Sequence, residues 1–144
     1  MAHRANAQRL SEERRADPGS FLEAYLVEHG PAFRPRLIPS LPEAIDAIHA
    51  AGGLAVWAHP FWGGATAEQV LKTIADFRDC GVDGIECFYP THTRQQTELL
   101  YDRCAKLGWL ATGSSDFHGP EHPLFSRFCA FATYGRPPLL GPLA

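Results

Sequence analysis

The sequence predicts an α/β fold in which helices alternate with the strands of a parallel sheet. Three short apolar runs, at 54–58, 84–88 and 109–112, alternate with amphipathic segments from residue 40 onward. Strands that are apolar throughout are typical of a sheet buried on both faces, as parallel sheets with right-handed crossover helices are. An α/β chain of this order forms either a barrel or an open sheet.

Before residue 40 the pattern is less regular. Residues 1–17 are rich in Arg and Glu, so we divide the chain into a charged N-terminal segment, 1–20, and a domain, 21–144. Ser20 is expected to cap a short helix over 21–28. The Pro-rich stretch that follows, 32–39, predicts an extended loop.

From residue 40 each element has a start or stop signal. Three helices are predicted to begin at a Ser or Thr capping residue and to end at glycine, over 40–51, 66–81 and 93–108. Each of the three apolar runs then forms a strand. Residues 128–134 are a candidate for a last strand.

Composition excludes several classes of protein. The 144 residues are 45% hydrophobic and 20% charged with a net charge of −3, which is ordinary for a globular domain and gives no bulk attraction to nucleic acid or membranes. The 4 cysteines form no Cys-x-x-Cys pair, which argues against a zinc ribbon and indicates reduced thiols. No apolar run approaches the roughly 20 residues of a membrane helix, and no signal peptide is recognisable. We therefore expect a cytoplasmic protein with no membrane partner.

Ligand-type side chains follow consecutive predicted strands. His59 ends the first apolar run, and Asp116 and His118 come just after the third. Because the carboxyl ends of parallel strands meet at one edge of the sheet, these three side chains are expected to converge. Imidazole and carboxylate ligands suit Zn, Mn or Fe, which generate hydroxide from water near neutral pH. The sequence therefore predicts a hydrolytic metal site.

Two local expectations refine this site. Pro60 should hold the preceding His59 in an extended conformation. Asp116 and His118, two residues apart in an extended segment, should project to the same side.

Two further residues are weaker candidates. Glu86, in the second strand, is a metal ligand, a hydrogen-bond partner of a ligand histidine, or a buried structural carboxylate. His92 follows the same strand and is expected to bind a phosphate oxygen or donate a proton, unless it only caps a helix or lies on the surface.

Three arginines are candidate phosphate ligands. Arg34 and Arg36 lie on the Pro-rich loop, where rigid guanidinium groups can clamp phosphate. Arg127 is a similar candidate nearer the C-terminus. The alternative for each is a solvated surface charge.

Four segments together resemble the PHP (polymerase and histidinol phosphatase) family of metal-dependent phosphoesterases. They are AGGLAVWAHP at 51–60, GVDGIEC at 81–87, THTRQQT at 91–97 and GSSDFHG at 113–119. The chain is most similar to the stand-alone bacterial branch of the family. The resemblance implies hydrolysis of nucleotide phosphate esters, such as nucleoside 3′,5′-bisphosphates, or exonuclease-like action on the 5′ ends of short RNA.

The resemblance also implies a distorted TIM-like βα barrel with a trinuclear cluster of divalent ions (Mn, Zn, Fe or Mg). His59, Asp116 and His118 match the later metal-binding motifs of the family, and Arg36 and His92 fall where phosphate contacts are expected. The family's N-terminal His-x-His motif is absent from the sequence. Since a closed barrel takes about 250 residues, the chain is expected to be the C-terminal part of one, with the N-terminal half missing.

The leading functional hypothesis is a phosphoesterase that uses metal-activated water, with His92 and Glu86 as catalytic candidates. Its partner would be a phosphorylated small molecule or a short nucleic acid. One alternative is an inactive half-barrel that pairs with a complementing N-terminal half or with a second copy of itself, because unpaired edge strands tend to associate. Another is a metal-dependent hydrolase of a non-phosphate substrate.

Overall fold

The computed structural model describes residues 18–27, 30, 32–35 and 37–143, in two compact units, Met1–Ile38 and Pro39–Ala144. The first unit contains helix α3 (Pro18–Tyr25). The prediction that Ser20 caps this helix is wrong, because Ser20 lies inside the helix and Pro18 occupies its first turn. Proline suits that position because its fixed φ is already helical and its missing N–H would have no partner there. The predicted charged segment lies mostly outside the described residues.

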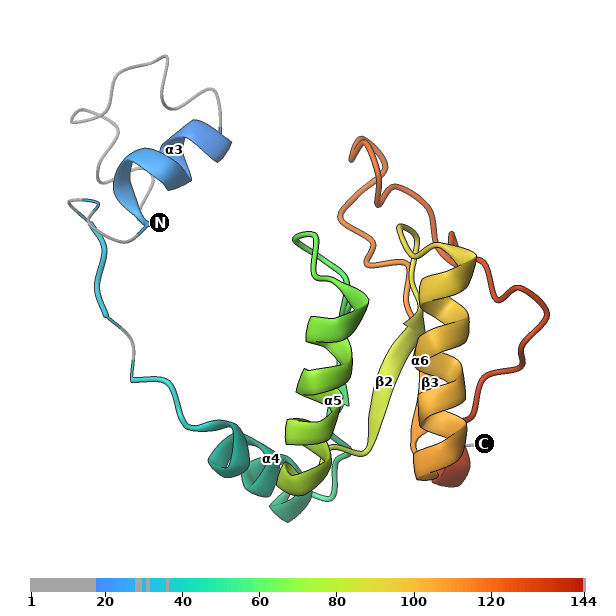
Figure 1. Ribbon diagram of the computed structural model, residues 1–144. Helices are drawn as coiled ribbons and strands as arrows, with labels where there is room; N and C mark the ends of the chain where they lie inside the picture. The colour runs from blue at the N-terminus through green and yellow to red at the C-terminus, as the bar shows by residue number, and fades with distance from the viewer. Residues whose placement is uncertain (1–17, 28–29, 31, 36, 144) are drawn as a thin grey trace. The chain divides into compact units, whose positions relative to one another are not determined.

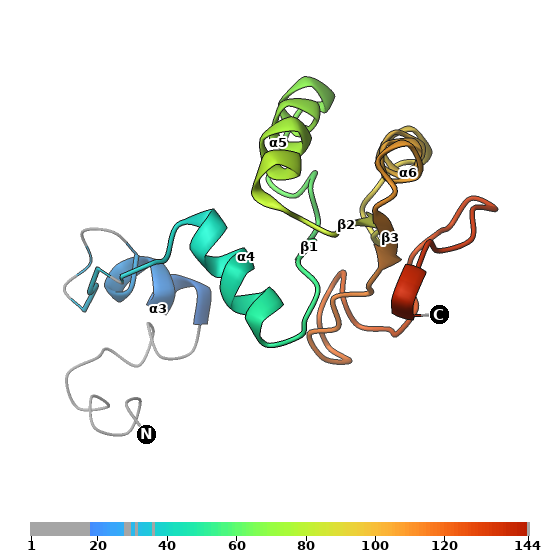
Figure 2. The same ribbon diagram turned by 90° about the horizontal axis from the view of Figure 1, so that it is seen from below.

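The second unit has the α/β alternation that the sequence predicts. Strands β1, β2 and β3 form a parallel sheet in that order, and α5 and α6 lie side by side on one face of it (Figures 1 and 2). None of the helices among the described residues is long and apolar enough to cross a bilayer. The elements are α4 (Leu41–Ala50), β1 (Val56–Trp57), α5 (Ala67–Cys80), β2 (Gly84–Phe88), α6 (Arg94–Leu107), β3 (Leu110–Gly113) and the 3-10 helix η1 (Gly141–Leu143).

The predicted capping residues of the three later helices are confirmed. Ser40, Thr66 and Thr93 each accept a hydrogen bond from the backbone N–H three residues later, and a Glu or Gln at that position bonds back to the cap. Each reciprocal pair satisfies two N–H groups that the helix leaves without partners. Gly81 and Gly108 end α5 and α6 in the left-handed conformation that glycine adopts without a steric penalty. These helices therefore begin and end where local chemistry dictates.

The core lies between the sheet and the two helices. Every residue of β2 is buried, and Ile85 and Cys87 are fully inaccessible. The thiols of Cys87 and Cys104 lie 3.6 Å apart and are not joined by a disulfide. The apolar stripes of the helices supply the other side of this core, with Val70 and Ile74 from α5 and Leu100, Tyr101 and Cys104 from α6.

The predicted last strand over 128–134 is wrong. Cys129 and Tyr134 have φ values of 54° and 52°, which no strand accommodates. Phe131 instead stacks on Phe88, with the rings inclined by 19°. The chain meets β3 only later, through an isolated antiparallel bridge between Ala111 and Leu139. Apolar residues alone could not distinguish a strand from a loop that covers the core.

Strand β1 is shorter than predicted and forms an edge of the sheet. Its two residues pair only with β2, and Val56 is 38% exposed. Just before it, the Ala55 N–H is bound by the Asp83 carboxylate at 2.6 Å rather than by a strand. In the part of the chain that the structure describes, the sheet is open. A closed barrel and a missing half therefore stay predictions.

Asp83 offers a test of how β1 is attached. Its carboxylate accepts hydrogen bonds from His49 Nε2 at 2.8 Å and from the buried Ala55 N–H. Burial opposes ionisation, but these two hydrogen bonds outweigh it and lower the pKa of Asp83 below 3.8. Asp83→Ala should cost about 1–3 kcal/mol at pH 7, because it leaves the Ala55 N–H without a partner.

The pH dependence follows from the sign of the shift. A lowered folded-state pKa stabilises the fold above about pH 3.8, and this contribution is lost as pH falls through the folded-state value. Urea denaturation from pH 2 to pH 7 should show this loss in the wild type and not in Asp83→Asn. Identical pH profiles for the two proteins would contradict the assignment.

The open edge at β1 predicts association. Its unpaired backbone groups and the exposed Val56 side chain should favour pairing between copies, and Val56→Lys should weaken that pairing. Light scattering over a range of protein concentrations measures the effect, with Ala105→Lys on α6 as a control for added charge. A wild-type monomer with protected amides in β1 would show the prediction to be wrong.

Candidate active site

A cavity of about 550 Å³ lies beyond the carboxyl ends of the strands. His59, Asp116 and His118, the three predicted metal ligands, all line it. They reach it from the segments that follow β1 and β3, as the rule for parallel sheets requires. The other lining residues are Trp62, Tyr89, His122, Leu124 and Phe125.

His59 lies in a tight turn directly after β1. Its N–H donates to Glu86 Oε2 at 2.6 Å, and its carbonyl accepts from the Trp62 N–H at 2.9 Å. Its φ is 34°, so the expectation that Pro60 holds it extended is wrong. The two backbone hydrogen bonds stabilise a conformation that local sterics disfavour. Such strained residues gather at functional sites, which supports a role for His59.

Asp116 is also held in the left-handed region, with a φ of 48°. Its N–H donates to Ser114 Oγ at 3.0 Å, and the Tyr89 hydroxyl donates to its Oδ2 at 2.7 Å. Burial, and then the Asp116 carboxylate, raise the pKa of Tyr89, so the phenol keeps its proton. The segment is therefore not extended as expected, and Tyr89 fixes the carboxylate in its place.

His118 is anchored by its backbone and by one ring nitrogen. Its N–H donates to the Phe125 carbonyl at 2.9 Å, and its Nδ1 contacts the Asp116 carbonyl. Since a carbonyl only accepts, Nδ1 carries a proton, and in the neutral ring Nε2 keeps its lone pair. A hydrogen bond from one ring nitrogen to a carbonyl is typical of histidines that bind a metal through the other.

His122 lines the cavity beside His118, with ring centroids 5.0 Å apart. Its Nδ1 accepts from the N–H groups of Leu124 at 3.3 Å and Phe125 at 3.0 Å. The neutral ring therefore carries its proton on Nε2, which makes that nitrogen a donor rather than a ligand. In the sequence, only the closeness of His122 to His118 indicates that it lies at the site.

Glu86 lies beneath the site. It is 7% exposed and binds the backbone N–H of His59. Burial raises its pKa, and the nearby Asp116 carboxylate adds to the rise, whereas the His59 N–H lowers it. Of the alternatives left open by the sequence, this contact supports a carboxyl that positions a candidate ligand. Direct ligation by Glu86 stays a prediction.

His92 is buried behind the cavity wall. It is 5% exposed, its Nδ1 lies 3.0 Å from the Cys87 carbonyl, and its ring meets that of Phe61 edge-on. Burial lowers its pKa and favours the neutral ring. It is not among the residues that line the cavity. Its predicted contact with phosphate, or with a transferred proton, stays a prediction.

The candidate phosphate ligands are less well placed by the structure. Arg34 belongs to the N-terminal unit, where its Nη1 donates to the Phe33 carbonyl at 2.8 Å. Arg36 lies outside the described residues. Arg127 is exposed and does not line the cavity. Their roles at phosphate stay predictions.

The donor types around the cavity fit a divalent metal, since His and Asp together suit Zn, Mn and Fe. The free Nε2 of His118 and the oriented Asp116 carboxylate fit best. In the described part of the chain, however, no three His, Cys, Asp or Glu side chains lie close enough together to hold an ion. The structure thus brings the predicted ligands to one cavity and leaves their convergence on a metal untested.

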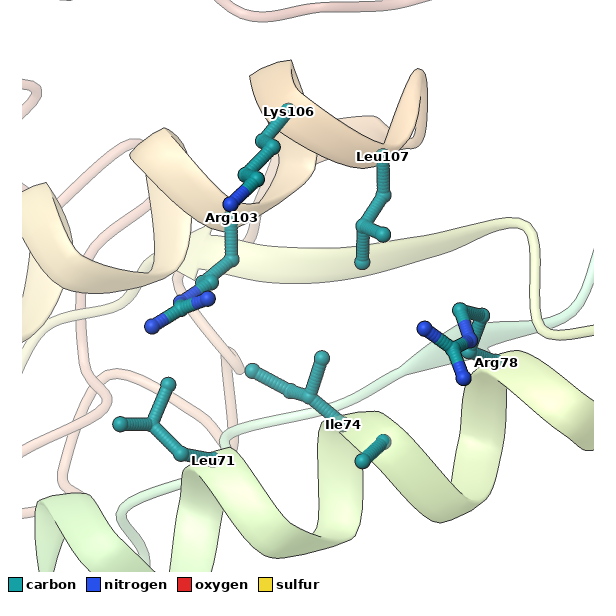
Figure 3. Close-up of a pocket in the computed structure, with 7 residues that line it drawn as sticks. Leu71, Ile74, Arg78, Arg103, Lys106 and Leu107 are labelled. Carbon is teal, nitrogen blue, oxygen red and sulfur yellow. The ribbon is translucent and has the colours of Figure 1, made fainter.

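A second cavity, of about 310 Å³, lies between α5 and α6 and has basic side chains around an apolar floor (Figure 3). Arg78 reaches it from α5, and Arg103 and Lys106 reach it from α6. Arg78 and Lys106 lie in the last turns of their helices, where cations offset the partial negative charge of the helix end. The C-terminal ends of these two helices lie away from the carboxyl ends of the strands, so we assign no catalytic role to this second cavity.

Known proteins with similar sequences are phosphoesterases. A 5′-3′ exoribonuclease of Haemophilus influenzae is 34% identical over 105 residues, 73% of this chain and 38% of the relative. A phosphoribosyl 1,2-cyclic phosphate 1,2-diphosphodiesterase of Eggerthella lenta is 38% identical over 81 residues, which are 54% of this chain and 28% of the relative. A 3′,5′-nucleoside bisphosphate phosphatase of Chromobacterium violaceum is 30% identical over 104 residues, which are 72% of this chain and 36% of the relative. No family model matches the chain.

One solved structure has a similar fold. It is an amidohydrolase from Chromobacterium violaceum, with bound sulfate and no metal, that is 30% identical and superposes with a TM-score of 0.54. The match covers 74% of this chain and 37% of that one.

The chain is similar in sequence and fold to part of a class of hydrolases, and the curated relatives among them are named for action on phosphate esters. The names of these relatives bear out the resemblance of its motifs to the PHP family. The chain spans between 28% and 38% of the length of the curated relatives it matches.

The ring nitrogens give a direct test of the site geometry. In long-range ¹H–¹⁵N spectra above pH 7.5, neutral His118 should carry its proton on Nδ1 and neutral His122 on Nε2, because their backbone partners require it. His122→Ala should remove one signal and leave the His118 tautomer unchanged. The reverse assignment of either ring would contradict the structure.

Proposed function

We propose that the chain carries part of the active site of a metal-dependent phosphoesterase acting on nucleotides or short nucleic acids. The observation that supports this most is the gathering of His59, Asp116 and His118 around one cavity at the strand ends. Relatives named as phosphatase, phosphodiesterase and exoribonuclease favour phosphate over amide as the bond cleaved. An amidohydrolase with a similar fold keeps a non-phosphate substrate as the alternative.

The proposal gives each residue a distinct task. His118 would bind metal through Nε2 and Asp116 through the oxygen that Tyr89 leaves free, with His59 as the third ligand. A bound divalent ion would polarise a phosphoryl oxygen and lower the pKa of water enough to supply a nucleophile. Tyr89 and Glu86 would orient Asp116 and His59 through the hydrogen bonds described above.

The substrate is proposed from chemistry and from relatives together. Exoribonuclease and nucleoside bisphosphate phosphatase are the names of two relatives, and both of those activities act on phosphates attached to a nucleoside. His92, Arg34, Arg36 and Arg127 are kept as candidate contacts for phosphate oxygens, with His92 also a candidate proton donor. The cytoplasmic location expected from the sequence belongs to the same proposal.

A second candidate function follows from the open edge of the sheet. Among the described residues β1 pairs only with β2, so its other edge can pair with a further strand. We propose that a complementing segment or a second copy pairs there and that the site is completed on pairing. On this hypothesis the purified chain alone binds metal weakly.

Metal titration tests the ligand assignment. His59→Ala, Asp116→Asn and His118→Ala should each weaken Mn²⁺ binding by more than the roughly tenfold expected from loss of an orienting partner. Tyr89→Phe should weaken it by about tenfold, because the Asp116 carboxylate loses the hydroxyl that orients it. Isothermal calorimetry measures the affinities. Glu98→Gln, on the exposed face of α6, is the matched control for lost charge. Unchanged affinity in all three ligand variants would reject the assignment.

Phosphate release tests the reaction. The chain with Mn²⁺ should hydrolyse adenosine 3′,5′-bisphosphate slowly, and Asp116→Asn should abolish the release, since the carboxylate is a proposed ligand. Malachite-green detection of phosphate over several hours gives the rate. Turnover that persists in Asp116→Asn, or that needs no metal, would overturn the mechanism.

A further inference from the structure

The rim of the candidate active site carries a large exposed aromatic ring. Trp62 lines the cavity together with the three candidate ligands and is 51% exposed. The other two benzene-type side chains of the lining, Tyr89 and Phe125, are only 2% and 3% exposed. Among the Trp, Tyr and Phe side chains of the described lining, Trp62 is therefore the one with a surface free to stack on a ligand.

Trp62 packs against two buried rings of the lining. Its indole lies 5.6 Å from the Phe125 ring and 6.3 Å from Tyr89, which it meets nearly edge-on at 81°. The backbone N–H of Trp62 donates to the His59 carbonyl at 2.9 Å, which places the residue in the turn that carries a candidate ligand. The indole is thus supported by packing and yet half exposed, as a preorganised contact surface would be.

The cavity consequently has two chemically different parts. Imidazole and carboxylate groups of His59, Asp116 and His118 form a polar part suited to a metal-held phosphate. Trp62 and the 56% exposed Leu124 form an apolar rim. A ligand that matches both parts has a phosphate at one end and a flat apolar group at the other. A nucleotide has this chemistry, whereas a simple sugar phosphate has only the polar half.

We infer that Trp62 is a stacking platform for the base of a nucleotide whose phosphate occupies the polar part of the cavity. The inference rests on the proposed function and deepens it by choosing base-bearing phosphates over sugar phosphates. Stacking of a base on an aromatic side chain contributes about 1–3 kcal/mol and tolerates any base, because every base has a π-face. Trp62 is accordingly a specificity-determining residue, and the same contact serves a mononucleotide or the terminal nucleotide of an RNA.

Calorimetry with two ligands separates the stacking contact from phosphate binding. The chain with Mn²⁺ is titrated with adenosine 3′,5′-bisphosphate and with ribose 5-phosphate, in the wild type, Trp62→Ala and Trp62→Phe. Trp62→Ala should weaken binding of the adenosine ligand by about tenfold or more and leave ribose 5-phosphate unchanged. Trp62→Phe, which keeps a π-face, should retain most of the affinity. Phe128→Ala removes an aromatic ring that is 73% exposed and does not line the cavity, so it should change neither affinity.

The outcomes distinguish this inference from the proposed function. Equal weakening of both ligands by Trp62→Ala would make the indole a general part of the wall and overturn the stacking role. Unchanged binding of the adenosine ligand in Trp62→Ala would also overturn it, while leaving phosphate binding intact. If the wild type binds neither ligand, the proposed function itself fails and the stacking inference fails with it. Near-identical thermal unfolding of the variants confirms that lost affinity is not lost fold.

Discussion

The candidate site depends on strand β2 because β2 is hydrogen-bonded on both sides. Its pairing with β1 places Trp57 beside Ile85, and its pairing with β3 places Thr112 beside Glu86. The segments that follow β1 and β3 therefore emerge next to one another at the same edge of the sheet. Two side chains from β2 and its end, Glu86 and Tyr89, then bind the segments on either side. A central buried strand thus fixes the distance between groups that lie far apart in the sequence.

At His59 and Asp116, hydrogen bonds to residues distant in the sequence offset local backbone strain. His59 and Asp116 both have positive φ values, which cost of order 1–3 kcal/mol each for residues other than glycine. Cys129 and Tyr134 share this conformation away from the cavity, so strain alone does not mark the site. What distinguishes His59 and Asp116 is that they line the cavity and that Glu86 and Tyr89, both buried, bind them. The same hydrogen bonds that offset the strain aim the side chains into the cavity.

The sequence predicted most of the elements because their signals are local. Capping residues and glycines bound helices by hydrogen bonds within a few residues, and uniformly apolar runs mark strands buried on both faces. It failed over 128–134, where apolar residues cover the core from a loop and no local signal separates this from a strand. It also failed on the backbone of His59, since Pro60 restricts that residue but the Glu86 carboxyl and the Trp62 N–H decide its conformation. Charge and a rigid loop suggest arginines as phosphate ligands, but neither property tells whether the guanidinium group reaches the cavity.

By itself the sequence determined the α/β alternation, the resemblance to a family and the three residues that line the cavity as candidate ligands. Each follows from a short motif at a strand end, where the direction of a parallel strand already says which edge of the sheet a residue joins. Only the tertiary structure decided that Tyr89 orients Asp116, that His122 presents a proton donor beside His118, and that Trp62 exposes its ring on the rim. These properties arise from contacts between residues distant in the chain and from the direction of single hydrogen bonds. No pattern along the chain encodes either one, because both exist only after the strands have paired.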